Sequence, residues 1–371
     1  MTGKKRSPLA FFATGLPLAA TIIIVLMIVI IVVDFAIIGV PNLGLEFLTE
    51  YPRNNNTEGG IFPAIFGTLL LVIIMTLVAV PIGTITAIYL TEYARQNSWF
   101  ARTIRFAVNT LAGVPSIVFG LFGAGFFIQT VGAGIDEARW ESKLEVAEVA
   151  LSEPSAPFAT LKQATIADVL KFLESDDAVY WNEAINAIET YPGGETATAS
   201  IDQVMTHLRA NPELNWGKPG LIWAALTLAL LTMPVVIVSV EEALRTVPRD
   251  IREASLALGA TKLETIIRVV LPNSITGMLT GSILAVSRGA GEVAPILFTG
   301  VLNSARELPT AVTDQFMHLG YHLYVLATQS PNVEAARPMQ YATTVVLLAL
   351  TLALNITAIM LRSRLRKKQF T

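Results

Sequence analysis

Long uncharged segments made almost entirely of apolar residues recur along this chain of 371 residues. Five charge-free runs lie between Arg6 and Asp34, Glu58 and Glu92, Arg105 and Asp136, Lys218 and Glu241, and Arg337 and Arg362. A sixth, from about Asn273 to Phe298, is apolar except for Arg288 and Glu292. About 20 apolar residues in a helix span the roughly 30 Å of membrane hydrocarbon. The pattern therefore predicts an all-α polytopic membrane protein with six transmembrane helices.

The first apolar run follows Lys4, Lys5 and Arg6, as the core of a signal peptide would. It is 27 residues long, whereas a signal-peptide core has about 7 to 15 residues. No small-residue cleavage site follows Val33. We therefore expect this run to be a retained membrane anchor.

Charge is scarce and unevenly distributed along the chain. Only 15% of the residues are charged and 53% are hydrophobic, whereas a soluble domain carries about 25% charged residues. Residues 132–219 are the exception, with 15 acidic and 6 basic side chains. This composition predicts a membrane protein that carries one polar insert. The net charge of −3 and the lack of a strongly basic stretch argue against nucleic acid as a partner.

Candidate metal and redox ligands are few. The chain contains no cysteine and three histidines, which excludes disulfides, thiolate metal sites and cysteine nucleophiles. His318 and His322 are four residues apart, but no glutamate follows His318, so the metalloprotease pattern is absent. We expect both histidines on a helix surface, and we expect no cofactor.

The distribution of Lys and Arg predicts which loops face the cytoplasm, because cytoplasmic loops keep the positive charge. With the N-terminus inside, the inner segments hold 16 basic residues and the much longer outer segments hold 9. Both termini are therefore expected in the cytoplasm, and the insert of residues 132–219 is expected on the outer side.

The insert itself has a helical pattern. Helix starts are expected at Thr165 with Asp168, at Ser200 with Gln203, and at Asp176 and Asp177. Turns are expected at 152–157 and 191–194, where Pro and Gly gather. Two interpretations remain open: a small solvated helical cap, which the pattern slightly favours, and a docking surface for an external partner.

The segment between the fourth and fifth predicted spans, residues 241–272, has the pattern of a helical elbow. Pro248 is well placed to begin a helix, and Gly259 suits the left-handed conformation that ends one. Apolar residues at helical spacing on both sides of Gly259 predict a short helix, a turn and a second helix. Pro272 then starts or kinks the fifth span. The chain has no phosphate-binding loop of the G-x-x-x-x-G-K-[ST] type.

The elbow resembles the EAA loop of permease subunits in ABC importers. Glu253, Ala254 and Ser255 are followed after three residues by Gly259, and nine residues later by Val269-Val270-Leu271-Pro272. The family pattern is Glu-Ala-Ala, three residues, Gly, nine residues and Ile-x-Leu-Pro, so Ser255 and Val269 are mild departures. The resemblance implies that this elbow is a coupling helix seated in a cleft of a separate ATPase subunit.

Two ionisable residues lie inside the fifth predicted span. Arg288 and Glu292 are four apart and are expected to share one helical face, with Gly289 to Gly291 thinning the helix between them. Counted from Asn273, Arg288 lies about 22 Å along the helix, beyond the middle of the membrane. Charges at such depth usually face a cavity or a partner, and a guanidinium fork matches phosphate-like oxygens. An anion pathway is the favoured interpretation. A self-neutralising structural pair and an Arg that reaches the outer interface remain alternatives.

Several glycines have spacings that are typical of helix packing. Gly277 and Gly281 form a Gly-x-x-x-Gly pair in the fifth predicted span. Gly120, Gly123 and Gly125 follow no strand, so helix packing explains them better than a dinucleotide-binding loop.

Five segments together are similar to the permeases of high-affinity phosphate importers, of the PstA type. They are residues 60–68, 81–83, 88–93, 111–120 and 287–292. The similarity runs over residues 59–131 and 219–300, and the long insert departs from the short loop usual in the family. It implies a type I ABC importer permease fold (MetI-like) and a role in phosphate passage for Arg288, Glu292 and Ser287. Thr68 and Ser116 are possible hydroxyl contacts, although core packing is the expected role of both.

The resemblance also implies an assembly in a bacterial inner membrane. The other components would be a second, PstC-like permease, a PstB-like ATPase dimer and a PstS-like extracytoplasmic phosphate-binding protein. ATP-driven switching would reach the membrane through Glu253, Ala254, Ser255, Gly259, Leu271 and Pro272. The chain itself would be a transport subunit that catalyses no bond chemistry.

The expected organisation has five segments. They are an N-terminal anchor with the first outer loop (1–58), spans two and three (59–131), the acidic insert (132–219), spans four and five with the elbow (220–300), and the last outer loop, span six and a basic tail (301–371). Four alternatives stay open at this point: a PstC-type permease, a permease for sulfate or molybdate, a secondary transporter and a membrane-embedded enzyme.

Overall fold

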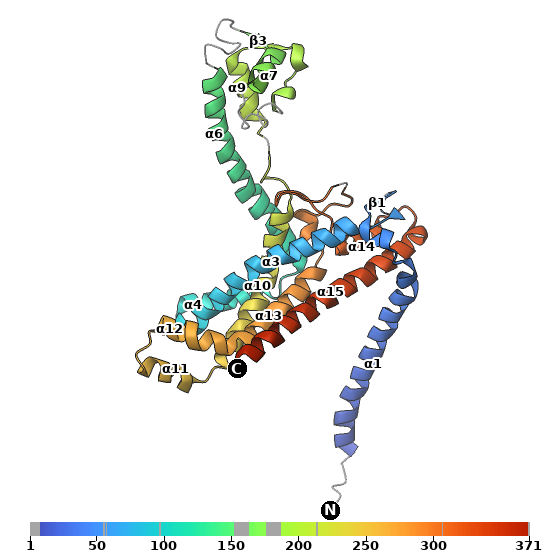
Figure 1. Ribbon diagram of the computed structural model, residues 1–371, viewed down its shortest axis with the longest axis vertical. Helices are drawn as coiled ribbons and strands as arrows, with labels where there is room; N and C mark the ends of the chain where they lie inside the picture. Colours follow the sequence, from blue (N-terminus) through green and yellow to red (C-terminus); the bar gives the residue numbers. More distant parts are fainter. Residues whose placement is uncertain are drawn as a thin grey trace, which may run out of the picture.

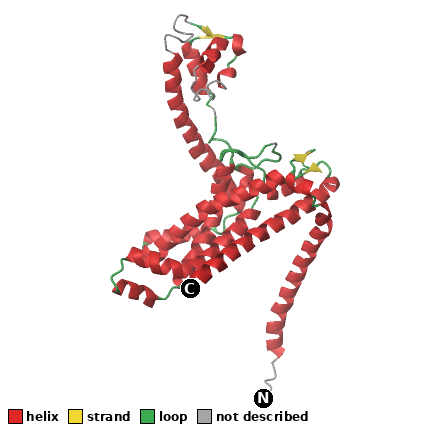
Figure 2. Cartoon of the chain, viewed as in Figure 1, coloured by secondary structure: helices red, strands yellow, loops and turns green. Residues whose placement is uncertain are grey.

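The computed structural model describes residues 8–54, 56, 58–95, 98–151, 163–175, 187–212, 214–305 and 307–369. These residues form an almost entirely helical molecule, with two short strand pairs (Figure 2). In the described chain, six helical stretches are long and apolar enough to cross a membrane: Gly15–Asn42, Phe62–Tyr93, Ser116–Glu145, Leu221–Arg245, Lys262–Gly291 and Val333–Arg364. The predicted all-α architecture with six spans is confirmed.

The first two spans are joined by a short segment. The elements are α1 (Pro8–Gly39), η1 (Val40–Asn42), α2 (Leu45–Thr49), the antiparallel pair β1 (Pro52–Arg53) and β2 (Glu58–Gly59), α3 (Phe62–Ile88) and the π-helical turn η2 (Tyr89–Tyr93). In Figure 1, α1 leans away from the other spans along most of its length. The C-terminal end of α1 meets α15 (Val333–Gln369).

The fourth span, α10 (Leu221–Arg245), is the central helix of the bundle, with α3 and α13 (Leu271–Gly291) packed against it. Gly277 and Gly281 on α13 make this packing close. A Cβ atom added at Gly281 would lie 2.2 Å from Cβ of Ser239, and one at Gly277 would lie 2.5 Å from Cβ of Ala243. Only glycine permits the two backbones to approach this closely, which confirms the packing role expected for the Gly-x-x-x-Gly pair.

The third span is shifted along the chain from its predicted position. Residues 105–111 belong to a separate amphipathic helix, α4 (Trp99–Leu111), and the span is formed by α5 (Ser116–Phe122), η3 (Gly123–Gly132) and the start of α6 (Ala133–Leu151). Pro115 explains the break, because proline disfavours helical backbone in the residue before it. The helix of this span therefore starts at Ser116, well after Arg105, and continues past Asp136 to Glu145.

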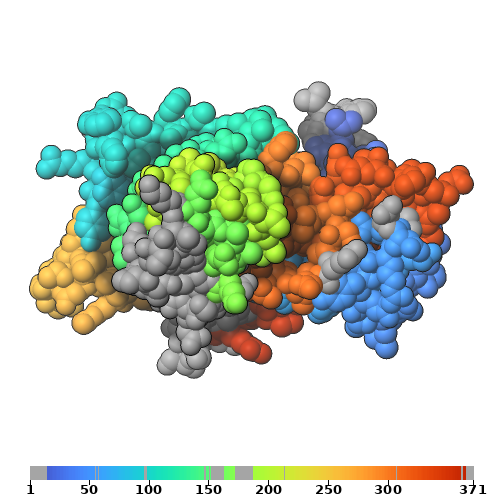
Figure 3. Space-filling view, turned by 90° about the horizontal axis from the view of Figure 1, so that it is seen from above, coloured from blue at the N-terminus to red at the C-terminus, as the bar shows by residue number. Residues whose placement is uncertain are grey.

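The insert is a small domain carried by α6. Its other elements are β3 (Ala164–Thr165), α7 (Ile166–Ser175), η4 (Gly194–Thr196), β4 (Thr198–Ala199) and α9 (Ile201–Ala210), and β3 pairs antiparallel with β4. Trp140, Ile166, Val169, Ile188 and Leu208 are among the buried residues of its separate core. Viewed end-on, the insert covers only part of the bundle and leaves the regions of α2 and α14 (Leu319–Thr328) open beside it (Figure 3).

The helical nature of the insert is confirmed in its described part. Ser200 and Gln203 form a reciprocal capping box at the start of α9, and the Asp168 amide donates to Oγ1 of Thr165 over 3.3 Å. The two-residue strands β3 and β4 were not predicted, because no alternating pattern that short stands out from a loop. The expected helix start at Asp176 and Asp177 and the expected turn at 152–157 lie outside the described residues.

Asp136 fixes the base of the insert to the third span. Its buried carboxylate accepts backbone N–H bonds from Asn215 (2.9 Å), Trp216 (2.8 Å) and Gly217 (2.6 Å). The carbonyl of Trp216 in turn accepts a bond from the indole of Trp223 on α10 at 2.7 Å. The chain leaving the insert is thus tied to both the third and the fourth span.

We expect Asp136→Ala to loosen this junction while the spans stay folded. Hydrogen bonds to a charged group contribute about 1.5–3 kcal/mol each, so the local free energy of opening at residues 215–217 should fall by roughly that amount or more. Faster amide exchange at these positions, measured by mass spectrometry in detergent, is the expected result. Glu137→Ala, at the exposed neighbouring position, is the control; equal exchange in both variants would contradict the role of Asp136.

His318 and His322 are buried, with 0% and 1% of their surface exposed. The expectation that they lie on a helix surface is wrong, because α14 packs against α3 and α15. The Nδ1 atom of His318 accepts the Gly320 amide at 3.1 Å, which caps the start of α14. Among the described residues, neither ring nitrogen of His322 has a hydrogen-bond partner. Burial lowers the pKa of each imidazole to about 4.

These two histidines should make the stability of the region around α14 depend on pH. In the unfolded chain an imidazole binds a proton near pH 6.5, whereas the folded protein resists protonation until about pH 4. The unfolded state therefore binds more protons between these values, and the free energy of unfolding falls as the pH drops from about 6.5 to 4. His322→Leu should remove on the order of 3 kcal/mol of that loss. Thermal unfolding midpoints at pH 7.5 and 5 test this; an unchanged pH dependence in the variant would contradict it.

Candidate functional site

The elbow, residues 241–272, is a helix–turn–helix at the end of the bundle opposite the insert (Figure 1). Its helices are α11 (Arg249–Ala257) and α12 (Lys262–Thr265), separated by Gly259 with φ of +88°. Pro248 lies immediately before α11 with φ of −58°, as suits a helix start. The predicted helix, left-handed glycine and second helix are confirmed.

The fifth span begins earlier than predicted, because α12 continues through the π-helical turn η5 (Ile266–Val270) into α13 without a break. Pro272 sits in the first turn of α13. The π-helical turn ahead of it changes the backbone pairing where the proline ring and the missing N–H would disturb an α-helix. The span therefore runs over Lys262–Gly291, and not over Asn273 to Phe298.

Two polar contacts within the elbow were not predicted. Thr261 and Glu264 form a capping box at the start of α12, a Thr-x-x-Glu pattern that could have been found from the sequence. Oγ of Ser255 lies 3.0 Å from Oγ1 of Thr265, so the residue that departs from the Glu-Ala-Ala pattern joins the two helices of the elbow.

The outer face of the elbow is exposed and partly apolar. Glu253 and Ala254 are exposed, and Leu258 has 90% of its surface accessible. Ile251 and Leu256 on α11 are exposed as well. Contiguous exposed apolar side chains that polar groups surround are typical of a protein contact surface.

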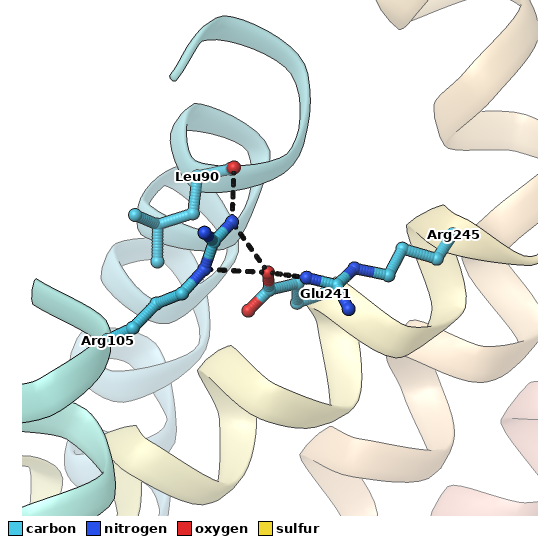
Figure 4. Close-up of polar contacts among 4 residues, drawn as sticks. All are labelled: Leu90, Arg105, Glu241 and Arg245. Carbon is cyan, nitrogen blue, oxygen red and sulfur yellow. Dashed lines mark hydrogen bonds and ion pairs between the residues drawn. The ribbon is translucent and has the colours of Figure 1, made fainter. Parts of the chain in front are cut away.

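A charged cluster lies where α4, α10 and η2 meet (Figure 4). Glu241 on α10 accepts bonds from Arg105 on α4 at 3.1 Å and from Arg245 at 2.5 Å. Arg105 also donates to the carbonyl of Leu90 at 2.9 Å. Arg105 is 136 residues from Glu241, so their pairing could not be predicted from local spacing, whereas Glu241 and Arg245 are four residues apart on one helix. The cluster ties the ends of three elements near the elbow into one unit.

Arg288 and Glu292 pair at the other end of the fifth span. Nε of Arg288 lies 3.4 Å from Oε1 of Glu292, and the two side chains are 41% and 25% exposed. The expectation that both lie on one helical face is wrong, because α13 ends at Gly291 and Glu292 has an extended backbone with ψ of 122°. Pro295 follows three residues later, which disfavours a continuing helix. Arg288 therefore lies in the last turn, where the carbonyl ends of the helix favour a cation.

The chain beside this pair is packed at Gly289 and open at Gly291. Sδ of Met75 fills the position beside Gly289, 2.4 Å from where a Cβ would stand, whereas nothing lies within 4 Å at Gly291. Ser287 points to the sixth span, where its hydroxyl hydrogen-bonds with Asn355. Thus Arg288 has free space on one side while its neighbours are held by other spans.

Other predicted residues have packing roles. Thr68 is fully buried and its hydroxyl accepts the Leu319 amide at 2.9 Å, so it supports the start of α14. Gly120 and Gly123 pack against the chain that follows Glu292, close to Pro295 and Thr299. Ser116 is half-buried at the start of α5. These findings agree with the packing roles expected for Thr68, Gly120 and Gly123. The packing role expected for Gly125 is wrong, because nothing lies within 4 Å of where its Cβ would stand.

The arrangement suits binding and movement. In the described chain, no group of three or more His, Asp or Glu side chains is placed to hold a metal ion. The exposed elbow and Arg288 lie at opposite ends of one continuous helical stretch, Lys262–Gly291, and Lys262 and Arg288 are about 39 Å apart along its axis. A rigid helix of this kind can pass a displacement from the elbow to the surroundings of Arg288.

Comparison with known proteins places this architecture in a family. The profile of the family described as binding-protein-dependent transport system inner membrane component matches residues 79–367. The chain belongs to this family. It is therefore a multi-pass protein of the inner membrane and a component of a transport system, which confirms the family expected from the elbow and its flanking segments.

Individual relatives carry more specific names. The chain is 30% identical over 239 residues to the phosphate transport system permease protein PstA of Mycobacterium leprae, covering 64% of this chain and 50% of that protein. It is 30% identical over 266 residues to PstA of Yersinia pestis, covering 71% and 61%. The chain thus spans between half and about three fifths of the length of these two relatives.

Among solved structures, the MetNI methionine ABC transporter in inward-facing conformations is similar with a TM-score of 0.45 and 14% identity. The match covers 81% of this chain and 94% of that one.

Proposed function

We propose that this chain is a permease subunit of an ATP-driven phosphate importer. The observation that carries the proposal is the elbow: an exposed helix–turn–helix with the Glu253, Gly259 and Pro272 pattern, continuous with the fourth and fifth spans. Family membership and the names of the relatives supply the substrate class. An exposed guanidinium at the far end of the same span supplies a group that suits an oxyanion.

In this proposal the elbow docks on a separate ATPase. Glu253, Ala254 and the exposed apolar side chains of α11 meet a cleft of one ATPase subunit, and Ser255 and Gly259 keep the shape of the elbow. Leu271 and Pro272 join it to the fifth span. Because α10 and α13 are packed closely through Gly277 and Gly281, a displacement of the elbow moves both helices together.

Phosphate would pass between this chain and a second, PstC-like permease that covers the exposed side of Arg288. An external PstS-like protein would deliver the anion, and a PstB-like dimer would hydrolyse ATP. Arg288 attracts the anion, while Glu292 at 3.4 Å offsets part of its charge. That compensation keeps binding weak enough for release, as conduction requires. Ser287 sets the position of Arg288 by holding the last turn of α13 against the sixth span.

The orientation follows from the same arrangement. The elbow and the C-terminal end of α15 lie at one end of the bundle, and the insert lies at the other (Figure 1). With the ATPase in the cytoplasm, both termini are cytoplasmic and the insert faces outward, in agreement with the distribution of Lys and Arg.

The decisive experiment combines co-purification with transport. The chain is expressed with the proposed second permease, ATPase and binding protein, and the complex is reconstituted in vesicles. ATP-dependent uptake of labelled phosphate with a stoichiometric ATPase is the expected result. Uptake of sulfate or molybdate in place of phosphate would reject the substrate, and ion-driven uptake with no bound ATPase would reject the proposal in favour of a secondary transporter.

A further inference from the structure

The π-helical turn η2 at the end of the second span contacts both helices of the elbow. Nη1 of Arg252 on α11 lies 2.7 Å from Oε1 of Glu92, and the two side chains are only 20% and 9% exposed. Nζ of Lys262 on α12 lies 4.9 Å from the centre of the Tyr93 ring. These contacts join segments that are 160 residues apart or more in the sequence.

Arg252 also binds the fourth span. Its Nη2 atom donates to the carbonyl of Leu244, in the last turn of α10, at 2.5 Å. One guanidinium on the elbow therefore holds two spans at once, η2 through a carboxylate and α10 through a backbone carbonyl. The planar fork of arginine, which offers donors in fixed directions, permits this double contact, whereas lysine offers a single point charge.

The second span is not next to the elbow along the chain. The fourth span leads into α11 and α12 leads into the fifth span, so movement of the elbow reaches these two spans directly. The second span receives it only through contacts. Its apolar packing on α10 is not directional and permits small sliding, whereas the ion pair of Arg252 and Glu92, with 2.7 Å between the charged atoms and little exposure, resists separation of η2 from α11, because leaving one charge of such a pair unpartnered is costly.

We propose that the Arg252–Glu92 pair is a positioning device that makes the second span follow the elbow. Arg105 on α4 also donates to the Leu90 carbonyl of η2 and pairs with Glu241. The turn η2 is therefore bound by both α4 and α11. A displacement of the elbow then moves spans two, four and five as one rigid body. This inference rests on the proposed docking of the elbow on an ATPase, and it adds a residue pair outside the Glu-Ala-Ala pattern.

Breaking the pair should uncouple ATP hydrolysis from transport. In the reconstituted complex we expect Glu92→Gln to keep the ATPase bound and hydrolysing ATP, while phosphate transported per ATP falls about tenfold, as for loss of one partner of a buried charge pair. Glu148→Gln is the matched control: Glu148 pairs with Arg209 on the insert at 3.4 Å, with both side chains more than half exposed. It should leave the ratio unchanged.

A reversible link tests the same point within one folded protein. Because the chain contains no cysteine, Glu92→Cys and Arg252→Cys can be joined by a short, reducible thiol-specific linker. The ratio of phosphate to ATP should be low in the unlinked double variant, rise when the linker is attached and fall again on reduction. A ratio that stays constant through this cycle would overturn the inference, as would a normal ratio in Glu92→Gln.

The outcome for the unmodified complex separates the two proposals. If the wild-type chain binds no ATPase or transports no phosphate, the proposed function fails. If it does both and the variants keep a normal ratio, only the positioning role of Arg252 and Glu92 fails.

Discussion

Replacing Arg288 with alanine should reduce phosphate uptake about a hundredfold while the complex with the ATPase still assembles. The guanidinium is the charged donor that the described residues place at the open end of the fifth span. Losing two charge-assisted bonds to an oxyanion costs about 3 kcal/mol, or roughly a hundredfold in affinity. Assembly is preserved because the elbow lies at the opposite end of the span. Initial rates of labelled phosphate uptake in vesicles, with the ATPase quantified in the same preparation, measure the effect.

Two further variants separate charge from geometry at this site. Arg288→Lys keeps the charge but loses the planar fork, so uptake should be intermediate. Glu292→Gln removes the partner that compensates Arg288, so the anion should bind more tightly and be released more slowly. Arg53→Ala is the control, because Arg53 is an exposed arginine in the first outer segment, paired with Glu50. Phosphate uptake by Arg288→Ala at the wild-type rate would show that the guanidinium serves packing alone.

The spans were predictable because the membrane imposes one rule on every segment. A helix that crosses hydrocarbon must be long and nearly uncharged, so hydropathy alone locates all six. The positions where these helices begin and end depend on backbone chemistry that hydropathy does not report. Pro115 and Pro295 are the signals that would have placed the start of the third span and the end of the fifth, since each disfavours helix in the residue before it.

The elbow was predictable in shape because its determinants are local. Pro248, Gly259 and the intervening apolar spacing specify a helix, a left-handed residue and a second helix without help from the rest of the chain. The contacts that hold the elbow in place were not predictable. Arg252 meets Glu92, and Arg105 meets Glu241, only because four helices converge at that end of the bundle.

The burial of His318 and His322 also depends on contacts between distant segments, and it could not be predicted from the local sequence. Spacing of four residues predicts both on one side of a helix, but only His322 lies in α14, because His318 is its N-cap, and the spacing does not tell which side faces the bundle. The packing of α14 between α3 and α15 decides that the ring nitrogens lose water. One sequence read by itself carries no signal for this choice.

Changing Gly259 should remove the ATPase from the complex. Gly259 has φ of +88°, and a Cβ there would have open space around it, so the penalty for another residue is purely conformational. A residue with a side chain loses on the order of 1–2 kcal/mol in left-handed backbone, and a β-branched residue is a genuine outlier there. In Gly259→Val the turn between α11 and α12 must therefore change shape. Because the contact surface on α11 and at Leu258 lies directly before this turn, co-purification of the ATPase should fall about tenfold.

Two comparisons make this expectation specific to the backbone at Gly259. Gly259→Asn should restore most of the association, since asparagine tolerates the left-handed region far better than valine. Gly44→Val makes the same substitution at a glycine with φ of −97° and ψ of 166°, where extended backbone accepts a β-branched residue, and it should have no effect. If Gly259→Val retains the ATPase as fully as Gly259→Asn, the shape of the turn does not govern docking. The contact would then depend on the exposed side chains of α11 alone, and Leu258→Ser would become the variant that releases the ATPase.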